Sequence, residues 1–199
     1  MAYVTNLPLN GKLSVTAFYG QTGAYWNGYH KGIDFISDNT AVYSICDGTV
    51  TVVGWDKNGW GRYVSIKPEG FERVRFILCH LVENSTKLKV GDKVTRTTKI
   101  GIMGSTGNSS GAHVHAEMRI DNTPVDISQY LLIPNRKTSN LLDTDFKFDA
   151  ACQASLLERI IEEFDGKQTE SSSAKKIAEL EKKLAAAEEK IKNAKLALE

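Results

Sequence analysis

Short apolar runs separated by glycines and turn residues fill the chain from about residue 13 to residue 133, and they predict β strands. No segment of this region has a helical period of useful length, so the pattern lacks the crossover helices that a parallel sheet needs. We therefore expect a mainly β fold built on an antiparallel sheet. The runs that predict strands are 41–56 (two strands about a turn), 61–81 (a hairpin), 98–104 and 112–120.

The pattern changes after Pro134, where polar and turn-forming residues replace the apolar runs. We assign residues 1–135 to one domain and residues 136–172 to a linker that contains a short amphipathic helix. The segment 166–173 (GKQTESSS) is expected to break this helix and to form a flexible joint. The apolar face of the helix follows the spacing i, i+3, i+4, i+7 and consists of Leu157, Ile160, Ile161 and Phe164.

The last segment, residues 173–199, has apolar residues alternately three and four positions apart, which is the heptad period of a coiled coil. It predicts a helix with a thin seam, because alanine occupies two of the three d-like positions, so self-association through it should be weak. Two interpretations stay open: a helix that is solvated or packs on its own domain, and one that binds a second copy or a partner. The seam consists of Ile177, Leu180, Leu184, Ala187, Ile191, Ala194 and Leu198.

Charge and composition exclude several classes of protein. The 199 residues include 25 basic and 24 acidic side chains, and no segment is strongly one-signed. This balance supplies no field that would gather phosphates or anionic lipids, so we expect neither nucleic-acid binding nor a polybasic membrane anchor. No apolar run approaches the ~18 residues of a membrane span. The cysteines have no C-x-x-C spacing, so neither a disulfide scaffold nor a cysteine-ligated zinc site is expected.

All four histidines lie in the predicted β domain, and two pairs of polar residues have spacings that suggest one site. His113 and His115 stand at i and i+2 of a β run, which places both side chains on one face about 7 Å apart. A straight strand would separate His30 from Asp34 by about 13 Å, and Gly32 between them is the expected kink that brings them together. Imidazole is both the commonest zinc ligand and a proton carrier at neutral pH. The spacing leaves open whether both residues of the first pair bind a metal or only one.

Three motifs occur in a fixed order: H-x-x-x-D from His30 to Asp34, C-H-L at His80, and G-S-T-G-N-S-S-G-A-H-V-H ending at His115. In these motifs the chain resembles the lysostaphin-type zinc metallopeptidases, the β-lytic or glycyl-glycine endopeptidase family. The resemblance covers roughly residues 14–133. It implies a lysostaphin-like antiparallel β fold and one zinc ion per chain.

The resemblance also implies a role for each matching residue. The expected zinc ligands are His30, Asp34 and His115, and the expected catalytic residues are His80 and His113. The family uses an upstream tyrosine to stabilise an oxyanion, for which Tyr25 is the nearest candidate and Tyr19 the alternative. The glycine-rich loop would wall a narrow substrate groove, with Gly107, Asn108, Ser109 and Ser110 as the expected substrate-binding residues.

Two imidazoles and one carboxylate leave one tetrahedral position of zinc open, which is typical of a catalytic site. Zinc would lower the pKa of its water toward ~7, and one or both of the other histidines would assist proton transfer. By resemblance the substrate is the stem or cross-bridge peptide of bacterial peptidoglycan.

Because no leader sequence or wall-binding repeat is recognisable, we expect a phage lysin or a tail-associated enzyme. Such an enzyme would be released by lysis or carried on the particle, where the C-terminal helix would have a partner. The alternative is an inactive, metal-free wall-binding or scaffold domain with the same fold.

Overall fold

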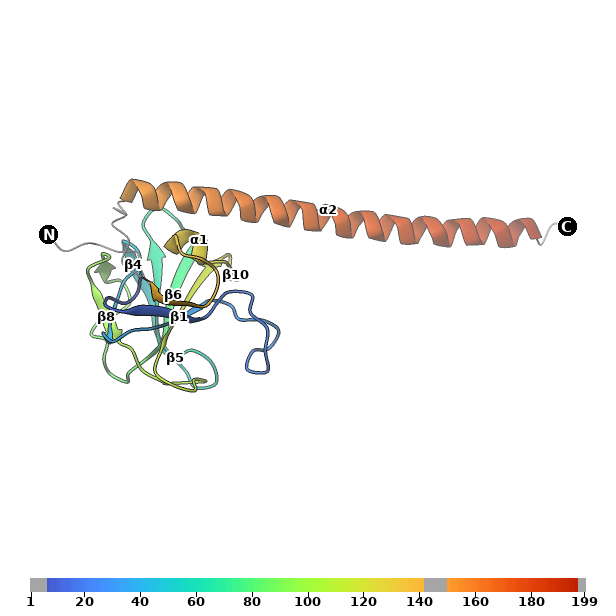
Figure 1. The fold of residues 1–199 in the computed structure, drawn as a ribbon. Helices are drawn as coiled ribbons and strands as arrows, with labels where there is room; N and C mark the ends of the chain where they lie inside the picture. The colour runs from blue at the N-terminus through green and yellow to red at the C-terminus, as the bar shows by residue number, and fades with distance from the viewer. Residues whose placement is uncertain (1–6, 142–149, 197–199) are drawn as a thin grey trace. The chain divides into compact units, whose positions relative to one another are not determined.

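The computed structural model describes residues 7–141 and 150–196, and the chain divides into two compact units, Met1–Glu158 and Arg159–Glu199. Figure 1 traces the strands and helices along the chain. The described strands are β1 Leu13–Ala17, β2 Ile33–Ile36, β3 Ala41–Tyr43, β4 Gly48–Asp56, β5 Gly61–Pro68, β6 Val74–Leu81, β7 Lys93–Val94, β8 Lys99–Ile102, β9 Val114–Ile120, β10 Thr123–Val125 and β11 Thr138–Leu141. The described helices are α1 Ser128–Leu131 and α2 Ala150–Leu196.

The large sheet is antiparallel throughout, as the alternating sequence predicts. Its strand order is β11-β1-β2-β9-β6-β5-β4-β7, with β10 paired to β9, and β3 and β8 form a second, two-stranded sheet. The strand β1 alternates buried and half-buried positions, whereas nearly every position of β6 and β9 is buried. These two central strands therefore carry the core of the first unit, and residues near their ends are held in place by it.

The pairing of the predicted strands differs from the expectation in one place. The run 61–81 forms the predicted hairpin, in which β5 pairs with β6. The run 41–56 also contains two strands, but β3 pairs with β8 in the small sheet and β4 pairs with β5. A distant residue stabilises the turn between β3 and β4: the Asp47 carboxylate accepts hydrogen bonds from the backbone N–H and from Nη2 of Arg96. The expected turn thus joins two sheets.

Two features of the predicted linker differ from the expectation. Residues 138–141 form β11, which pairs with β1 and is the edge strand of the large sheet on that side. The break predicted at 166–173 is absent, because α2 continues without interruption through this segment. A glycine costs only about 1 kcal/mol in a helix and serine less, whereas proline, which breaks helices, does not occur here. The hydroxyl of Thr169 donates to the carbonyl of Asp165 one turn earlier.

The side chains of α2 agree with the predicted apolar face as far as they are described. Leu157 and Ile160 are buried, and Ile161 and Phe164 are half-buried. At the start of the heptad segment, Ile177 and Leu180 are each 56% exposed. The side chains of Leu184, Ala187, Ile191 and Ala194, and all of Leu198, lie outside the described residues. Among the described residues, no helix has both the length and the apolar composition that crossing a membrane requires.

A buried hydrogen bond to the Ile45 carbonyl offers a test of the core. The Tyr130 side chain is 0% exposed, its hydroxyl donates to the Ile45 carbonyl at 3.0 Å, and its ring lies 4.5 Å from that of Phe76. Replacing Tyr130 by phenylalanine should lower the free energy of unfolding by about 1–2 kcal/mol, since the buried carbonyl loses this donor. Urea unfolding measures the loss. Tyr43→Phe, at a half-buried position, is the control, and equal losses in both variants would contradict the assignment.

Candidate metal centre

The antiparallel pairing of β2 with β9 sets Asp34 directly opposite His115. His30 lies just before β2, and its ring packs edge-on against that of His115 at 4.8 Å between centroids. The Asp34 Oδ1 atom lies 2.9 Å from His115 Nδ1 and 3.1 Å from His30 Nε2, and the two nitrogens lie 3.0 Å apart. Three potential ligand atoms from distant parts of the sequence therefore face one point.

Gly32 contributes space to this arrangement. The strand β2 begins at Ile33, so His30 and Asp34 do not lie on one straight strand, and the 13 Å separation expected for such a strand does not apply. A Cβ atom on Gly32 would overlap the Ala116 carbonyl and would lie 2.9 Å from His115 Nε2. Glycine is needed here because the imidazole ring and a neighbouring backbone occupy the place of a side chain.

The outer nitrogens of both rings are held by acceptors. His30 Nδ1 donates to the Phe18 carbonyl at 3.1 Å, and His115 Nε2 donates to the Glu117 carboxylate at 3.3 Å. Because a carbonyl or carboxylate only accepts, the outer nitrogens carry the protons of the neutral rings. In the neutral rings the lone pairs lie on His30 Nε2 and His115 Nδ1, the nitrogens nearest Asp34, where a metal ion would accept them; without a metal, His115 Nδ1 carries a proton and donates it to Asp34 Oδ1.

These three residues fit a tetrahedral metal ion. Ligands bound to zinc at 2.0–2.2 Å lie about 3.3–3.6 Å from one another, and the observed separations of 2.9–3.1 Å are only a few tenths of an ångström shorter. The donor set of two neutral imidazoles and one carboxylate is one that zinc prefers. Among the described residues, His30, Asp34 and His115 form the group that could hold a metal ion.

Without a metal, protons and hydrogen bonds balance the charges of this group. Burial would raise the pKa of Asp34, but hydrogen bonds from His115 and His30 hold it far below its usual value. Burial would lower the pKa of His115, but hydrogen bonds to Asp34 and Glu117 raise it to about 9. At neutral pH the metal-free site therefore holds a proton on His115, which a metal ion must displace.

The other two histidines lie beside this group: His80 belongs to β6, and His113 is the last residue of the glycine-rich loop 104–113. The rings of His80 and His113 lie 4.5 Å apart, and His113 Nε2 lies 3.8 Å from Asp34 Oδ1. His113 Nδ1 donates to the Gly111 carbonyl at 2.8 Å, and His80 Nδ1 donates to the Thr106 carbonyl at 2.8 Å. In their neutral forms both rings therefore have an unprotonated Nε2 atom.

The backbone of His80 has a left-handed conformation, with φ at 61°. Only a small fraction of residues other than glycine adopt such angles, and they persist where the surroundings hold them. The surroundings here are specific: the His80 N–H donates to the Trp60 carbonyl at 2.8 Å, and a Cβ on Gly104 would lie 2.9 Å from the His80 carbonyl oxygen. The left-handed backbone of His80 coincides with the register shift in the pairing of β6 with β5.

The glycine-rich loop contains the four predicted substrate-binding residues. Gly107, with φ at 76°, packs against the backbone of Gly59 and Gly61, and the Asn108 N–H donates to the Gly59 carbonyl. This contact attaches the loop to the turn between β4 and β5. Asn108 and Ser110 are exposed, and the Ser109 hydroxyl lies 3.3 Å from His113 Nδ1.

The two tyrosine candidates occupy different surroundings. Tyr25 is 82% exposed, and its ring contacts Trp26, which in turn lies 5.0 Å from the His30 ring. The Tyr19 hydroxyl donates to the Pro124 carbonyl, and burial followed by the hydrogen bond with Tyr29 raises its pKa. Tyr25 is therefore exposed and is connected to His30 only through Trp26, whereas the Tyr19 hydroxyl already donates to a backbone carbonyl.

The buried cysteines take no part in the group of ligand atoms. Cys46 and Cys79 are free, and burial raises the pKa of both thiols. Cys79 directly precedes His80 but belongs to the core. The Cys152 side chain lies outside the described residues.

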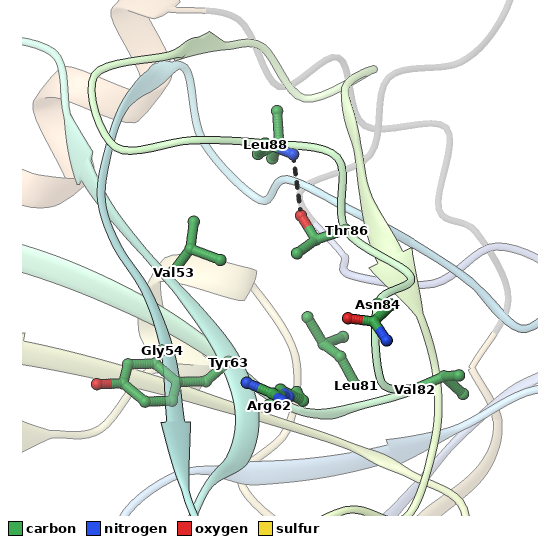
Figure 2. A pocket seen from close by; sticks show the side chains of 9 residues that line it. All are labelled: Val53, Gly54, Arg62, Tyr63, Leu81, Val82, Asn84, Thr86 and Leu88. Carbon is green, nitrogen blue, oxygen red and sulfur yellow. Dashed lines mark hydrogen bonds between the residues drawn. The ribbon is translucent and has the colours of Figure 1, made fainter.

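A pocket of about 220 Å³ lies apart from the histidine group (Figure 2). Arg62 alone carries a charge among its lining residues, and its guanidinium pairs with Glu83 and stacks on Trp55 at 4.8 Å. Among the residues that line the pocket, Leu81 is the direct sequence neighbour of His80. The pocket is lined by Val53, Gly54, Arg62, Tyr63, Leu81, Val82, Asn84, Thr86 and Leu88.

Sequence reasoning missed two residues of this site, Glu117 and Trp60. The Glu117 carboxylate is 0% exposed and bonds to His115, and the Trp60 indole N–H donates to Glu117 at 3.1 Å. A period of two was the available signal for Glu117, since it continues the alternation of His113 and His115. No comparable pattern marks Trp60.

The model of Peptidase family M23 matches residues 28–127, half of the chain, and this range contains the three potential ligands as well as His80 and His113. The chain belongs to Peptidase family M23. Among relatives in this family, the peptidoglycan DD-endopeptidase ShyB of Vibrio cholerae is 34% identical over 141 residues, which cover 67% of this chain and 32% of ShyB. The chain thus spans about a third of the length of that relative.

Solved structures of M23 peptidases share the fold. The catalytic domain of lysostaphin from Staphylococcus simulans has a TM-score of 0.54 and 29% identity, covering 59% of this chain and 91% of that domain. A variant of the catalytic domain of the prophage-encoded M23 protein EnpA from Enterococcus faecalis has a TM-score of 0.54 and 27% identity, covering 65% and 98%. A zinc-containing peptidase from Vibrio cholerae has a TM-score of 0.53 and 28% identity, covering 63% and 39%. The lysostaphin-like β fold is therefore confirmed.

The protonation of His80 can be measured directly. Burial lowers its pKa from 6.5 to about 4, an effect that the hydrogen bond to the Thr106 carbonyl only partly offsets. As the pH falls, His80 is therefore protonated in the unfolded chain before it is protonated in the folded protein. The free energy of unfolding should consequently decrease between about pH 6.5 and pH 4 because of this residue.

Imidazole ¹H–¹⁵N correlation spectra of the metal-free protein between about pH 3 and 8 give the midpoint, with His80→Gln to assign the signal. A His80 midpoint at or above 6.5 would contradict the expected shift.

Proposed function

We propose that the chain is a zinc-dependent endopeptidase that hydrolyses peptide bonds in bacterial peptidoglycan. The observation that carries the proposal is the convergence of His30 Nε2, Asp34 Oδ1 and His115 Nδ1 within about 3 Å of one another, beside two further histidines. In this proposal these three residues hold one zinc ion per chain. Membership of the family and the zinc-containing neighbour support the choice of metal.

Zinc in this position would supply Lewis-acid polarisation of a peptide carbonyl and would lower the pKa of water to near neutral. The protein would contribute the proton transfers. The Nε2 atoms of His80 and His113 are free to accept a proton, because the Nδ1 atom of each ring donates to a backbone carbonyl. A protonated ring could then donate to the oxyanion or to the leaving amine. Such groups contribute about 10²- to 10⁴-fold to a rate.

Exposed side chains near the proposed metal site would orient the substrate peptide. Exposed Asn108 and Ser110 belong to the loop that ends at His113, and Tyr25 lies exposed next to Trp26 on the side of His30. We retain the groove role for this loop and the oxyanion role for Tyr25 as parts of the proposal. The relatives named peptidoglycan DD-endopeptidase and glycyl-glycine endopeptidase support a wall peptide as the substrate.

A phage-borne version of the function has support from one structural neighbour. EnpA is described as prophage-encoded, and it matches 65% of this chain. On that basis we propose that this enzyme acts on the cell wall as a phage lysin or as a tail-associated hydrolase. Mass spectrometry of purified phage particles would detect the chain in the tail-associated case and would not detect it in the lysin case.

The alternative function is an inactive wall-binding or scaffold domain with the same fold. Zinc content and turnover on purified sacculi separate the two functions. One zinc per chain with release of soluble peptides supports the enzyme. A metal-free protein that binds sacculi without releasing peptides would establish the scaffold instead.

The division of roles among the histidines predicts two kinds of variant. His115→Ala should lose zinc, because it removes one of the three proposed ligands. His113→Ala and His80→Ala should keep zinc and lower the rate of peptide release by about 10²- to 10⁴-fold. Atomic absorption measures the metal and chromatography of released peptides measures the rate. Equal zinc loss in all three variants would contradict the assignment.

The heptad segment supports a second prediction, weak self-association through the C-terminal helix. Ile177 and Leu180, the first two residues of the seam, are each 56% exposed. Deleting residues 173–199 should shift the mass from a concentration-dependent mixture to a monomer, measured by light scattering. A monomer for both proteins at every concentration would exclude the homo-oligomer and would leave a separate partner, such as a phage-particle protein, for this helix.

A further inference from the structure

We propose that Glu117 and Trp60 are positioning residues for the metal centre. Glu117 holds the outer edge of His115 so that Nδ1 faces the metal position, and Trp60 holds Glu117. This inference rests on the proposed metal site, and it assigns a role to two residues outside the ligand set.

Glu117 is placed for this role by the strand that carries His115. It stands two residues after His115 on β9, so both side chains emerge on the same face of the sheet. Its carboxylate is 0% exposed. A buried carboxylate is costly unless its lone pairs are filled, so the position of the side chain depends on its donors.

Three groups donate hydrogen bonds to the Glu117 carboxylate. Arg119 Nε donates to Oε1 at 2.6 Å, while Trp60 Nε1 at 3.1 Å and His115 Nε2 at 3.3 Å donate to Oε2. The Arg119 guanidinium also stacks on the Trp60 ring, at 5.1 Å from its centroid. Glu117, Trp60 and Arg119 therefore contact one another, and His115 gives the carboxylate its third hydrogen bond.

The two imidazoles of the proposed metal site are held differently. His30 donates to a neutral backbone carbonyl, that of Phe18, whereas His115 donates to a charged carboxylate. A carboxylate acceptor fixes the ring orientation and makes the opposite nitrogen a stronger ligand. We therefore expect the hydrogen bond at the outer nitrogen of His115 to affect metal affinity more than the one at the outer nitrogen of His30.

Trp60 links this support to the proton-transfer side of the centre. Its indole N–H reaches Glu117, and its backbone carbonyl accepts the N–H of His80, the residue with a left-handed backbone. Trp60 is itself held by Asp56, whose Oδ2 accepts the Trp60 backbone N–H at 3.2 Å. One residue of the β4–β5 turn thus determines the positions of both His80 and, through Glu117, His115.

The test measures zinc affinity by competition with a chromophoric chelator at fixed pH. Glu117→Gln keeps the shape but not the charge, and it turns an amide N–H₂ toward a donor. We expect zinc affinity to fall about 10- to 100-fold.

Trp60→Phe keeps an aromatic ring and removes one donor, so a loss of about three- to tenfold in zinc affinity is expected. The matched control is Trp55→Phe, a change at a 48% exposed tryptophan with no contact to Glu117, which should leave the affinity unchanged.

Two further measurements distinguish positioning from a general loss of structure. In the cobalt-substituted protein, the visible absorption spectrum should change in Glu117→Gln and stay unchanged in Trp55→Phe, because it reports ligand geometry. In the double variant, Trp60→Phe should add little to the loss caused by Glu117→Gln, since Trp60 acts through that carboxylate. If Glu117→Gln does not fold, Trp60→Phe alone decides.

The outcomes are separable. A folded Glu117→Gln protein with zinc affinity within twofold of the wild type, or an equal loss in Trp55→Phe, would overturn the inference and leave the proposed function intact. A wild-type protein that binds no zinc would overturn the proposed function itself.

Discussion

The pairing of β2 with β9 is the constraint on which the centre depends. It sets Asp34 opposite His115, so that a carboxylate and an imidazole separated by 81 residues meet at 2.9 Å. The pairing is held by a core in which Ile33, Phe35 and Val114 are fully buried. A slip of one residue would turn every side chain of a strand to the opposite face, and the apolar core does not permit it.

Burying so many polar groups in one place is costly, and the structure offsets the cost with complementary partners. Glu117 is matched by Arg119, and Asp34 is matched by the two imidazoles. Burial would lower the pKa of His115, but its hydrogen bonds to Asp34 and Glu117 raise it to about 9, so without metal this ring carries a proton. A metal ion at the same point would replace that proton, so metal binding would exchange the hydrogen bond between His115 and Asp34 for two metal–ligand bonds and would depend on pH.

The residues of the proposed site differ in how they are held. His115 lies on the central strand β9, while His80 lies one residue before the end of β6 with a left-handed backbone that packs against Trp60 and Gly104. The loop before His113 is attached to the β4–β5 turn by the close contact of Gly107 with Gly59 and Gly61. The strands β2 and β9 thus hold two of the proposed ligands, Asp34 and His115, and neighbouring turns hold the groups around them.

Local sequence pattern was sufficient to predict an antiparallel sheet and the strands β3 to β6, β8 and β9, because a period of two and the turn residues act over a few positions; the strands β1, β2, β7, β10 and β11 lie outside the predicted runs. The ordered motifs around His30, His80 and His115 were sufficient to indicate the family that the comparison confirms. Both depend on residues close together in the chain, which is the range over which sequence spacing carries information.

Only the tertiary structure decided which strands are neighbours, as in the separation of β3 from β4, and whether α2 breaks at Gly166. It also decided that Trp60 supports Glu117, because their contact joins residues 57 positions apart and has no local signature. The physical reason is that long-range packing selects among locally acceptable conformations. It also determines which buried polar groups must find a partner.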